Sequence, residues 1–224
     1  MKKQSLRIMA ECSIMIALAV VLDLLCKMIP GFDWFWGYGG SISVSVLPIL
    51  FLSYRHGWKT GLLSSFIYSL LQMVLGFYPP PVQKPIYFIL CILLDYVIGF
   101  SVFGLADLFA RPFRPRHMRL GYVFSTVFCC LLRFFSSFLS GILVFNSNFY
   151  VGEGEALPSL GVALSDPGAW IYSLTYNGSY MLANTILNPI LIVLICMALD
   201  PKTLRRPVKP DTKVEEEDET APRP

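Results

Sequence analysis

IYFILCILLDYVIGFSVF, residues 86–103, is an apolar run that contains one charged side chain, Asp95. As a helix, the run is long enough to cross the hydrocarbon layer of a membrane. A carboxylate at that depth is expensive, and it needs a cation, a hydrogen-bond donor or a wet cavity. The run therefore predicts a membrane helix with a functional residue inside it.

The composition of the whole chain agrees with a membrane protein. Of its 224 residues, 55% are hydrophobic and only 15% are charged, whereas a soluble domain carries about a quarter charged residues. Six apolar runs are expected to form helices, at residues 8–28, 41–54, 58–77, 85–110, 119–146 and 170–199. The second run is short, so it is expected to be tilted, broken or partly re-entrant. The predicted fold is all-α: one compact bundle of six transmembrane helices over residues 1–199.

Positive charges predict how this bundle is oriented. They gather before the first run, between the second and third, between the fourth and fifth, and after the sixth: Lys2, Lys3, Arg7, Arg55, Lys59, Arg111, Arg114, Arg116, Arg119, Lys202, Arg205, Arg206 and Lys209. By the positive-inside rule, both termini are predicted to be cytoplasmic. The first run lacks a small-residue cleavage site, so it is expected to be a membrane helix and not a signal peptide. Residues 200–224 are polar and are expected to form a disordered cytoplasmic tail.

Several classes of function receive no support from the residue inventory. The six cysteines have neither zinc-site nor disulfide spacing, and the two histidines, His56 and His117, fall in predicted cytoplasmic loops. No nucleophile–base pair of an enzyme is recognisable. The net charge of +3 comes from the loop residues above, so nucleic-acid binding has no separate support. Neither a metal nor a cofactor is expected.

A polar and aromatic set remains at membrane depth, mostly toward the outer side. Its members are Asp95, Tyr96, Arg133, Ser136, Ser137, Ser140, Tyr172, Tyr176, Asn177 and Ser179. Helical spacing places Arg133, Ser137 and Ser140 near one face of their helix, because three or four residues make one turn. Together these groups suit a flat, cationic, hydrogen-bonding ligand: aromatic faces attract a cation, a carboxylate neutralises it and amides bind its edges.

Each group also has a purely structural interpretation, which the residues alone leave open. Asp95 and Arg133 could form a buried ion pair between two helices. The serines and Asn177 could be interhelical hydrogen-bonding residues. Trp34 and Trp36 could belong to an interfacial aromatic belt.

Six motifs follow one another along residues 8–198. In order they are Gly39-Gly40-Ser41-Ile42-Ser43, Leu47-Pro48-Ile49, Ser53-Tyr54-Arg55-His56-Gly57 with Gly61, Leu93-Leu94-Asp95-Tyr96, Ser140-Gly141 and Tyr172-Ser173-Leu174-Thr175-Tyr176-Asn177-Gly178-Ser179-Tyr180. Together they resemble the thiamine-specific S-component family of energy-coupling factor (ECF) transporters. The resemblance implies a six-helix subunit in the cell membrane of a prokaryote that captures thiamine from outside and does not hydrolyse ATP. Its implied partners are a transmembrane coupling protein and two ATPase subunits.

The resemblance also implies roles for individual residues. Asp95 occupies the family's acidic ligand position, next to Tyr96, where it would face the thiazolium cation or its polar neighbours. Tyr172 and Asn177 match a tyrosine and an asparagine that line the family's pocket.

The fifth run carries further matches to the family and two departures from it. Arg133 falls at a basic position of the family, and Gly141 at a glycine that lets the ligand approach closely. Ser137 stands where the family has a histidine that contacts ligand. Phe145 stands where the family has a tryptophan, and its ring attracts a cation more weakly.

Residues 31–40 are rich in glycine and aromatic side chains and are expected to act as a gate over the ligand. Either Trp34 or Trp36 would supply a stacking ring there. The runner-up within the same class is an S-component for a related vitamin or a thiamine precursor. Two other classes stay open: a stand-alone secondary transporter or channel, and a membrane enzyme or assembly scaffold. A secondary transporter would need a coupling-ion site or repeat symmetry, and neither is evident in the sequence.

The first run carries a possible contact surface for a partner. Ser13 and Ala17 lie four residues apart, a spacing of small residues that allows close helix approach. The resemblance makes this face the docking site for the coupling protein. Internal packing of the same residues is the alternative.

Overall fold

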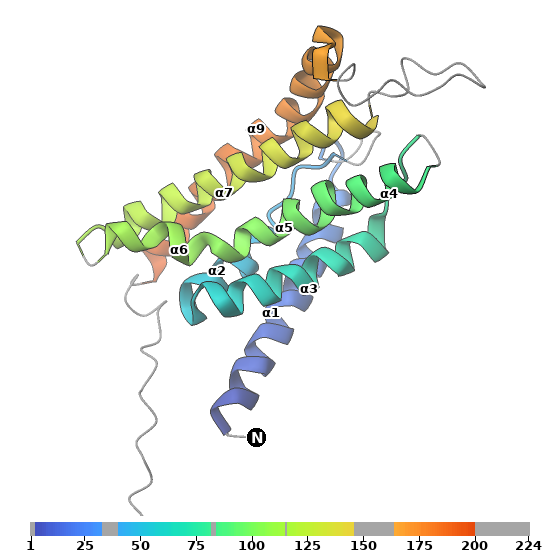
Figure 1. Ribbon diagram of the computed structural model, residues 1–224. Coiled ribbons are helices and arrows are strands. Elements are labelled where there is room, and N and C mark those ends of the chain that lie inside the picture. The colour runs from blue at the N-terminus through green and yellow to red at the C-terminus, as the bar shows by residue number, and fades with distance from the viewer. Residues whose placement is uncertain (1–2, 33–39, 82–83, 115, 146–163, 200–224) are drawn as a thin grey trace, which may run out of the picture.

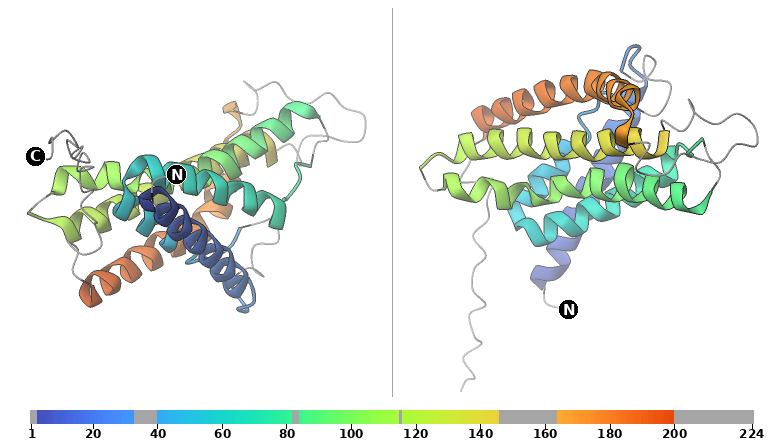
Figure 2. Two further views of the ribbon diagram at one scale, coloured as in Figure 1. Left: turned by 90° about the horizontal axis from the view of Figure 1, so that it is seen from below. Right: turned by 45° about the horizontal axis from the view of Figure 1, so that its top comes forward.

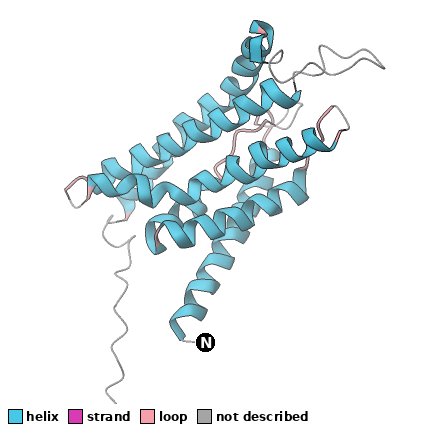
Figure 3. Ribbon diagram, viewed as in Figure 1, coloured by secondary structure: helices cyan, strands magenta, loops and turns pink. Residues whose placement is uncertain are grey.

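The computed structural model describes residues 3–32, 40–81, 84–114, 116–145 and 164–199. Trp34, Trp36, most of the 147–169 loop and the predicted tail lie outside these residues. Within them the regular structure is entirely helical (Figure 3). The elements are α1 (Lys3–Lys27), α2 (Val46–His56), α3 (Trp58–Gly76), α4 (Pro85–Cys91), η1 (Ile92–Ile98), α5 (Gly99–Ser101), η2 (Val102–Leu105), α6 (Ala106–Ala110), η3 (Arg111–Phe113), α7 (Met118–Ser140), η4 (Gly141–Phe145) and α9 (Pro167–Ala198).

The helices form one bundle in which α1 crosses the others steeply. α7 and α9 run side by side, and the rod from α4 to α6 lies along α7 on one side and α3 on the other (Figures 1 and 2). Among the described residues, four helices are long and apolar enough to cross a membrane: Ser5–Lys27, Pro85–Phe113, Met118–Phe145 and Pro167–Ala198. The predicted all-α membrane fold is therefore confirmed.

The distribution of side chains is inverted relative to a soluble protein. Leu63 and Val74 of α3 are 62% and 77% exposed, whereas Ser65 and Ser69 on the same helix are fully buried. Lipid solvates large apolar side chains, and hydroxyl groups are better paired inside the bundle. Ser65 illustrates this, because its hydroxyl donates to the carbonyl oxygen of Ser101 on the neighbouring rod at 3.2 Å.

The second predicted helix starts later than expected. Residues 41–45 were predicted to be helical, but the helix begins at Val46 and has 11 residues. At about 1.5 Å per residue it is too short to cross a hydrocarbon layer. Irregular backbone is tolerated at membrane depth only where protein or a wet cavity satisfies its polar groups. Side chains of α9 meet that condition for the 40–45 segment.

Two segments of the long helices have π-helical geometry, in which hydrogen bonds run from residue i to residue i+5. They are η1 and η4, and each continues an α-helix within one apolar span. π-helical turns widen a helix locally and occur often at functional sites. Asp95 and Tyr96 lie in η1, and Gly141 and Phe145 lie in η4.

Small residues allow the helices to pack closely at the other end of the bundle. A Cβ atom added to Gly61 of α3 would lie 2.5 Å from the carbonyl oxygen of Gly104 and 2.7 Å from the Cβ of Ser53. The Ser53 hydroxyl also donates to that carbonyl oxygen, at 2.7 Å. The helices α2, α3 and η2 therefore pack closely at this end of the bundle, and the cavity is lined by other residues.

Candidate ligand-binding site

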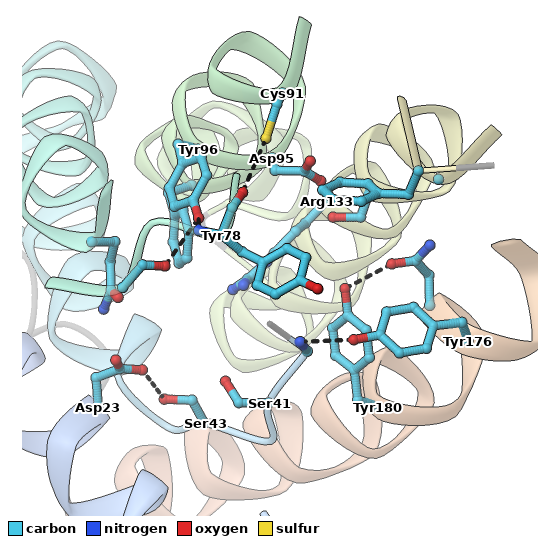
Figure 4. A pocket seen from close by; sticks show the side chains of 18 of the residues that line it. Asp23, Ser41, Ser43, Tyr78, Cys91, Asp95, Tyr96, Arg133, Tyr176 and Tyr180 are labelled. Carbon is cyan, nitrogen blue, oxygen red and sulfur yellow. Dashed lines mark hydrogen bonds between the residues drawn. The ribbon is translucent and has the colours of Figure 1, made fainter. Parts of the chain in front are cut away.

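A polar cavity lies between α1, the 40–45 segment, the ends of α3 and η1, α7, η4 and α9 (Figure 4). The space between its walls is about 920 Å³, which includes the mouth that opens to solvent. Small-molecule sites combine apolar walls with a few placed polar groups, as this cavity does. The cavity has three distinct corners.

The first corner holds Asp95 and Arg133. The Ser140 hydroxyl of α7 donates to Oδ2 of Asp95. The Arg133 guanidinium lies over the ring of Phe100, 4.1 Å from its centroid, and its buried Nε has no hydrogen-bond partner. The salt bridges among the described residues do not include one between Asp95 and Arg133. The two side chains therefore lie in one corner without a direct ion pair, although the charge of Arg133 acts on Asp95 across it.

The second corner is built from aromatic rings and one amide of α9. Tyr172 and Tyr176 stack with ring centroids 6.1 Å apart and an interplanar angle of 11°, and Tyr176 meets Tyr180 edge to face at 5.9 Å. Helical spacing of four residues places the three rings on one face. Oδ1 of Asn177 accepts a hydrogen bond from the Tyr180 hydroxyl at 2.9 Å, and its Nδ2 donates to Ser173 at 3.1 Å.

Further aromatic side chains face this corner from other elements. Phe145 of η4 packs against Tyr78, with 5.9 Å between the centroids. Tyr78 projects into the middle of the group in Figure 4. The hydroxyl of Tyr96 donates to the carbonyl oxygen of Gly76 at 3.0 Å and accepts from the amide of Tyr78 at 2.9 Å. Tyr96 therefore positions the turn that carries Tyr78.

The third corner is formed by Asp23 and Lys27 of α1 and by the 40–45 segment. Lys27 Nζ lies 2.9 Å from Oδ2 of Asp23, and the Ser43 hydroxyl donates to Oδ1 at 3.0 Å. Ser45 and Gln72 line the cavity close by. The groups that this corner offers are therefore an ion pair, hydroxyls and one amide.

Helix α9 holds the 40–45 segment in place. The amide of Ser43 donates to Oδ1 of Asn184 at 2.9 Å, and Nδ2 of Asn184 donates to the carbonyl oxygen of Ser41 at 2.9 Å. The amide of Gly40 donates to the Tyr176 hydroxyl at 3.1 Å. These bonds satisfy backbone groups that a helix would have satisfied internally, so they explain the late start of α2.

Most residues predicted to bind ligand line this one cavity. They are Asp95, Tyr96, Arg133, Ser137, Gly141, Phe145, Tyr172 and Asn177. The other two predicted residues, Trp34 and Trp36, lie outside the described residues. Two further members of the polar set are not among the lining residues. Ser136 donates to the carbonyl oxygen of Leu94 at 2.6 Å, and Ser179 is exposed, with its hydroxyl donating to the carbonyl oxygen of Tyr176 on the same helix.

Gly141 has a packing role that the resemblance did not imply. A Cβ atom at this position would lie 2.9 Å from Nδ2 of Asn177 and 2.9 Å from the Cβ of Ser173. The missing side chain therefore makes room for α9 as well as forming part of the cavity wall.

The corner around Asp23 was not predicted from the sequence. Asp23 is 6% exposed and lies inside an apolar run, as Asp95 does. A charge at membrane depth is costly, so the position of Asp23 alone indicated a partner or a function. Gln72 in the third run gave a similar signal, because a buried amide in an apolar helix needs partners.

The predicted docking residues of α1 face away from the bundle. Ser13 and Ala17 are exposed, with the Ser13 hydroxyl donating to the carbonyl oxygen of Met9 at 3.0 Å. Ala19, in contrast, is fully buried. Internal packing therefore accounts for Ala19 but not for Ser13 and Ala17.

A helical membrane bundle with a polar, aromatic-walled cavity defines the general class, that of integral membrane proteins that bind a small ligand. Comparisons with known proteins make the class specific. The model of the thiamine transporter protein family matches residues 9–204. The chain therefore belongs to the thiamine transporter protein family, and it is a membrane transport protein, not an enzyme.

Individual relatives agree with this family. The chain is 32% identical over 212 residues to the thiamine transporter ThiT of Bacillus subtilis, covering 91% of this chain and 96% of that protein. It is 24% identical over 169 residues to the thiamine transporter ThiT of Lacticaseibacillus paracasei, covering 72% and 75%. The solved structure of ThiT from Listeria monocytogenes superposes with a TM-score of 0.62 at 19% identity, covering 91% of this chain and all of that one. That structure supports the fold.

Proposed function

We propose that this chain is the thiamine-binding S-component of an ECF-type importer. It captures thiamine from outside the cell and delivers it through a transmembrane coupling protein driven by two partner ATPases. Family membership and the chemistry of the cavity support the ligand, and the outward face of α1 supports the partner.

The observation that carries the ligand assignment is that Asp95 lines the cavity and that no cationic side chain of the described residues lies within salt-bridge distance of its carboxylate. A carboxylate in a cavity wall that makes no direct ion pair is complementary to a cationic ligand, and water exclusion strengthens that attraction. Thiamine carries a permanent thiazolium cation. The stacked rings of Tyr172 and Tyr176 offer π-faces to the same ligand.

The second ring of thiamine, an aminopyrimidine, fits the corner formed by α9. It is flat and carries hydrogen-bond donors and acceptors on its edge. Asn177 is 5% exposed and presents an amide there, beside the tyrosine rings. Amides bind such edges, and aromatic walls accept the faces.

The direct test is a binding titration of the purified protein in which tryptophan fluorescence is the readout. The ligands are thiamine, its pyrimidine half, its monophosphate and diphosphate, and riboflavin. Saturable binding of thiamine that is much tighter than that of riboflavin is the expected result. A response to the pyrimidine half alone would indicate a precursor transporter, and no response to thiamine or its relatives would overturn the assignment.

The importer class needs a separate test, because binding does not identify the energy source. The chain is reconstituted in liposomes with and without a coupling protein and its two ATPases. Thiamine accumulation is expected only in the complete assembly supplied with ATP. Uptake by the chain alone would instead indicate a stand-alone secondary transporter.

A further inference from the structure

The corner formed by Asp23 and Lys27 is not used by the two rings of the proposed ligand. The Asp23 side chain is 8% exposed and that of Lys27 is 30% exposed, and they form an ion pair one helical turn apart. Burying a charged pair is expensive, and a pair of apolar side chains in the same place is often at least as stable. The position of the pair in the cavity wall suggests a role in binding.

The neighbours of the pair leave it accessible from the cavity. Ser43 occupies Oδ1 of Asp23, and Lys27 occupies Oδ2, yet each carboxylate oxygen can accept a further hydrogen bond. The ammonium group has three donors and uses one of them on Asp23. Beside it, a Cβ atom on Gly76 would lie 3.5 Å from Nζ, so glycine leaves space next to the ammonium.

Figure 4 shows how this corner relates to the others. Asp23 and Ser43 lie at one end of the group of labelled residues, Asp95 and Arg133 at a second, and Tyr176 and Tyr180 at a third. A two-ring ligand with its cation at Asp95 and its flat edge at the tyrosines has one substituent left, the alcohol of its hydroxyethyl chain.

We propose that the Asp23–Lys27 pair is the subsite for the alcohol group of the ligand and selects the free alcohol over its phosphate esters. This proposal rests on the proposed binding of thiamine. The alcohol donates its proton to the Asp23 carboxylate and accepts a hydrogen bond from the Lys27 ammonium, so both charged groups keep a partner.

A phosphate ester does not satisfy the pair in the same way. It has acceptor oxygens and a charge between −1.5 and −2 at neutral pH, on the order of that of a phosphorylated side chain. Lys27 attracts it, but Asp23, 2.9 Å from the ammonium, repels it and already neutralises the single positive charge. The intact pair therefore disfavours a dianion, and removing one partner shifts the selectivity in a direction set by the partner that remains.

The test measures one ratio, the Kd for thiamine monophosphate divided by the Kd for thiamine, in the purified full-length protein. The wild type is expected to give a ratio above one. Asp23→Asn frees Lys27 to bind phosphate, so the ratio is expected to fall by about tenfold to a hundredfold, the size of one charge-assisted hydrogen bond. Lys27→Met removes the attraction and keeps the repulsion, so the ratio is expected to rise.

Glu11→Gln is the matched control. It also neutralises a carboxylate on α1, but Glu11 pairs with Arg55 at 2.9 Å, away from the cavity-lining residues. Its ratio should equal that of the wild type.

Opposite shifts in the two cavity variants cannot result from general destabilisation. Unchanged ratios in both variants, or a wild type that prefers the monophosphate, would overturn the subsite while leaving thiamine binding intact. A wild type that binds no thiamine would overturn the proposed function and this inference with it.

Discussion

Replacing Asp95 by asparagine is the sharpest test of how the cavity recognises its ligand. The substitution keeps the size of the side chain and an acceptor for the Ser140 hydroxyl, and it removes the charge. A cation about 4 Å from a carboxylate gains about 4 kcal/mol at an effective dielectric constant near 20. Asparagine recovers part of this through its amide dipole, so we expect a loss of about 2–4 kcal/mol, which is roughly 30- to 1,000-fold in Kd.

The assay compares thiamine with its neutral pyrimidine half by titration calorimetry on wild-type and Asp95→Asn protein. Only the complete vitamin carries the cation, so its affinity should fall while that of the fragment changes by less than about threefold. Equal losses for both ligands would show that Asp95 holds the shape of the cavity and does not neutralise the ligand. Ser140→Ala serves as the companion variant, since it disturbs the same hydrogen bond and retains the charge.

Three further predictions concern the packing, the partner surface and the 40–45 segment. Gly104→Ala places a Cβ 2.5 Å from the carbonyl oxygen of Gly61 and should lower stability by about 1–3 kcal/mol in thermal unfolding. Gly178→Ala meets nothing within 4 Å and should be neutral or stabilising. Equal Tm values for the two variants would contradict the close contact between α3 and η2. Exchanging Ser13 and Ala17 for tryptophan should abolish ATP-driven uptake and preserve thiamine affinity, and a parallel loss of affinity would mean that these residues support the fold. Asn184→Ala leaves the Ser43 amide and the Ser41 carbonyl without these partners, so the amides of the 40–45 segment should lose about 1–3 kcal/mol of protection against hydrogen exchange. Unchanged protection would mean that other side chains keep the segment in place.

The sequence was sufficient for those parts of the fold that depend on local composition. Long apolar runs fix helices, and the observed α1, α3 and α9 lie close to the predicted bounds. The same holds for site residues that share a helix face, such as Tyr172 and Tyr176, because a spacing of four residues brings side chains together regardless of the rest of the fold.

Features that depend on distant partners could not be predicted. The late start of α2 follows from the hydrogen bond between Ser43 and Asn184, which are 141 residues apart. No local sequence pattern predicts a contact between residues so far apart. The π-helical turn at Asp95 is accompanied by a hydrogen bond from Ser136 to the carbonyl oxygen of Leu94, which is also a tertiary contact. Asp23 is different, since its burial could have been inferred from the argument already applied to Asp95.

The bonds between α9 and the 40–45 segment have a consequence for biosynthesis. The cavity joins Asp23, near the beginning of the chain, to Asn177 in a helix that follows all the other described helices. A nascent chain that has inserted everything up to η4 still lacks the amides that hold residues 41–43, together with one entire wall of the cavity. Under the proposed function, ligand binding therefore requires that α9 has packed against the rest of the bundle, and vitamin added during synthesis is expected to protect only chains in which α9 is already in place.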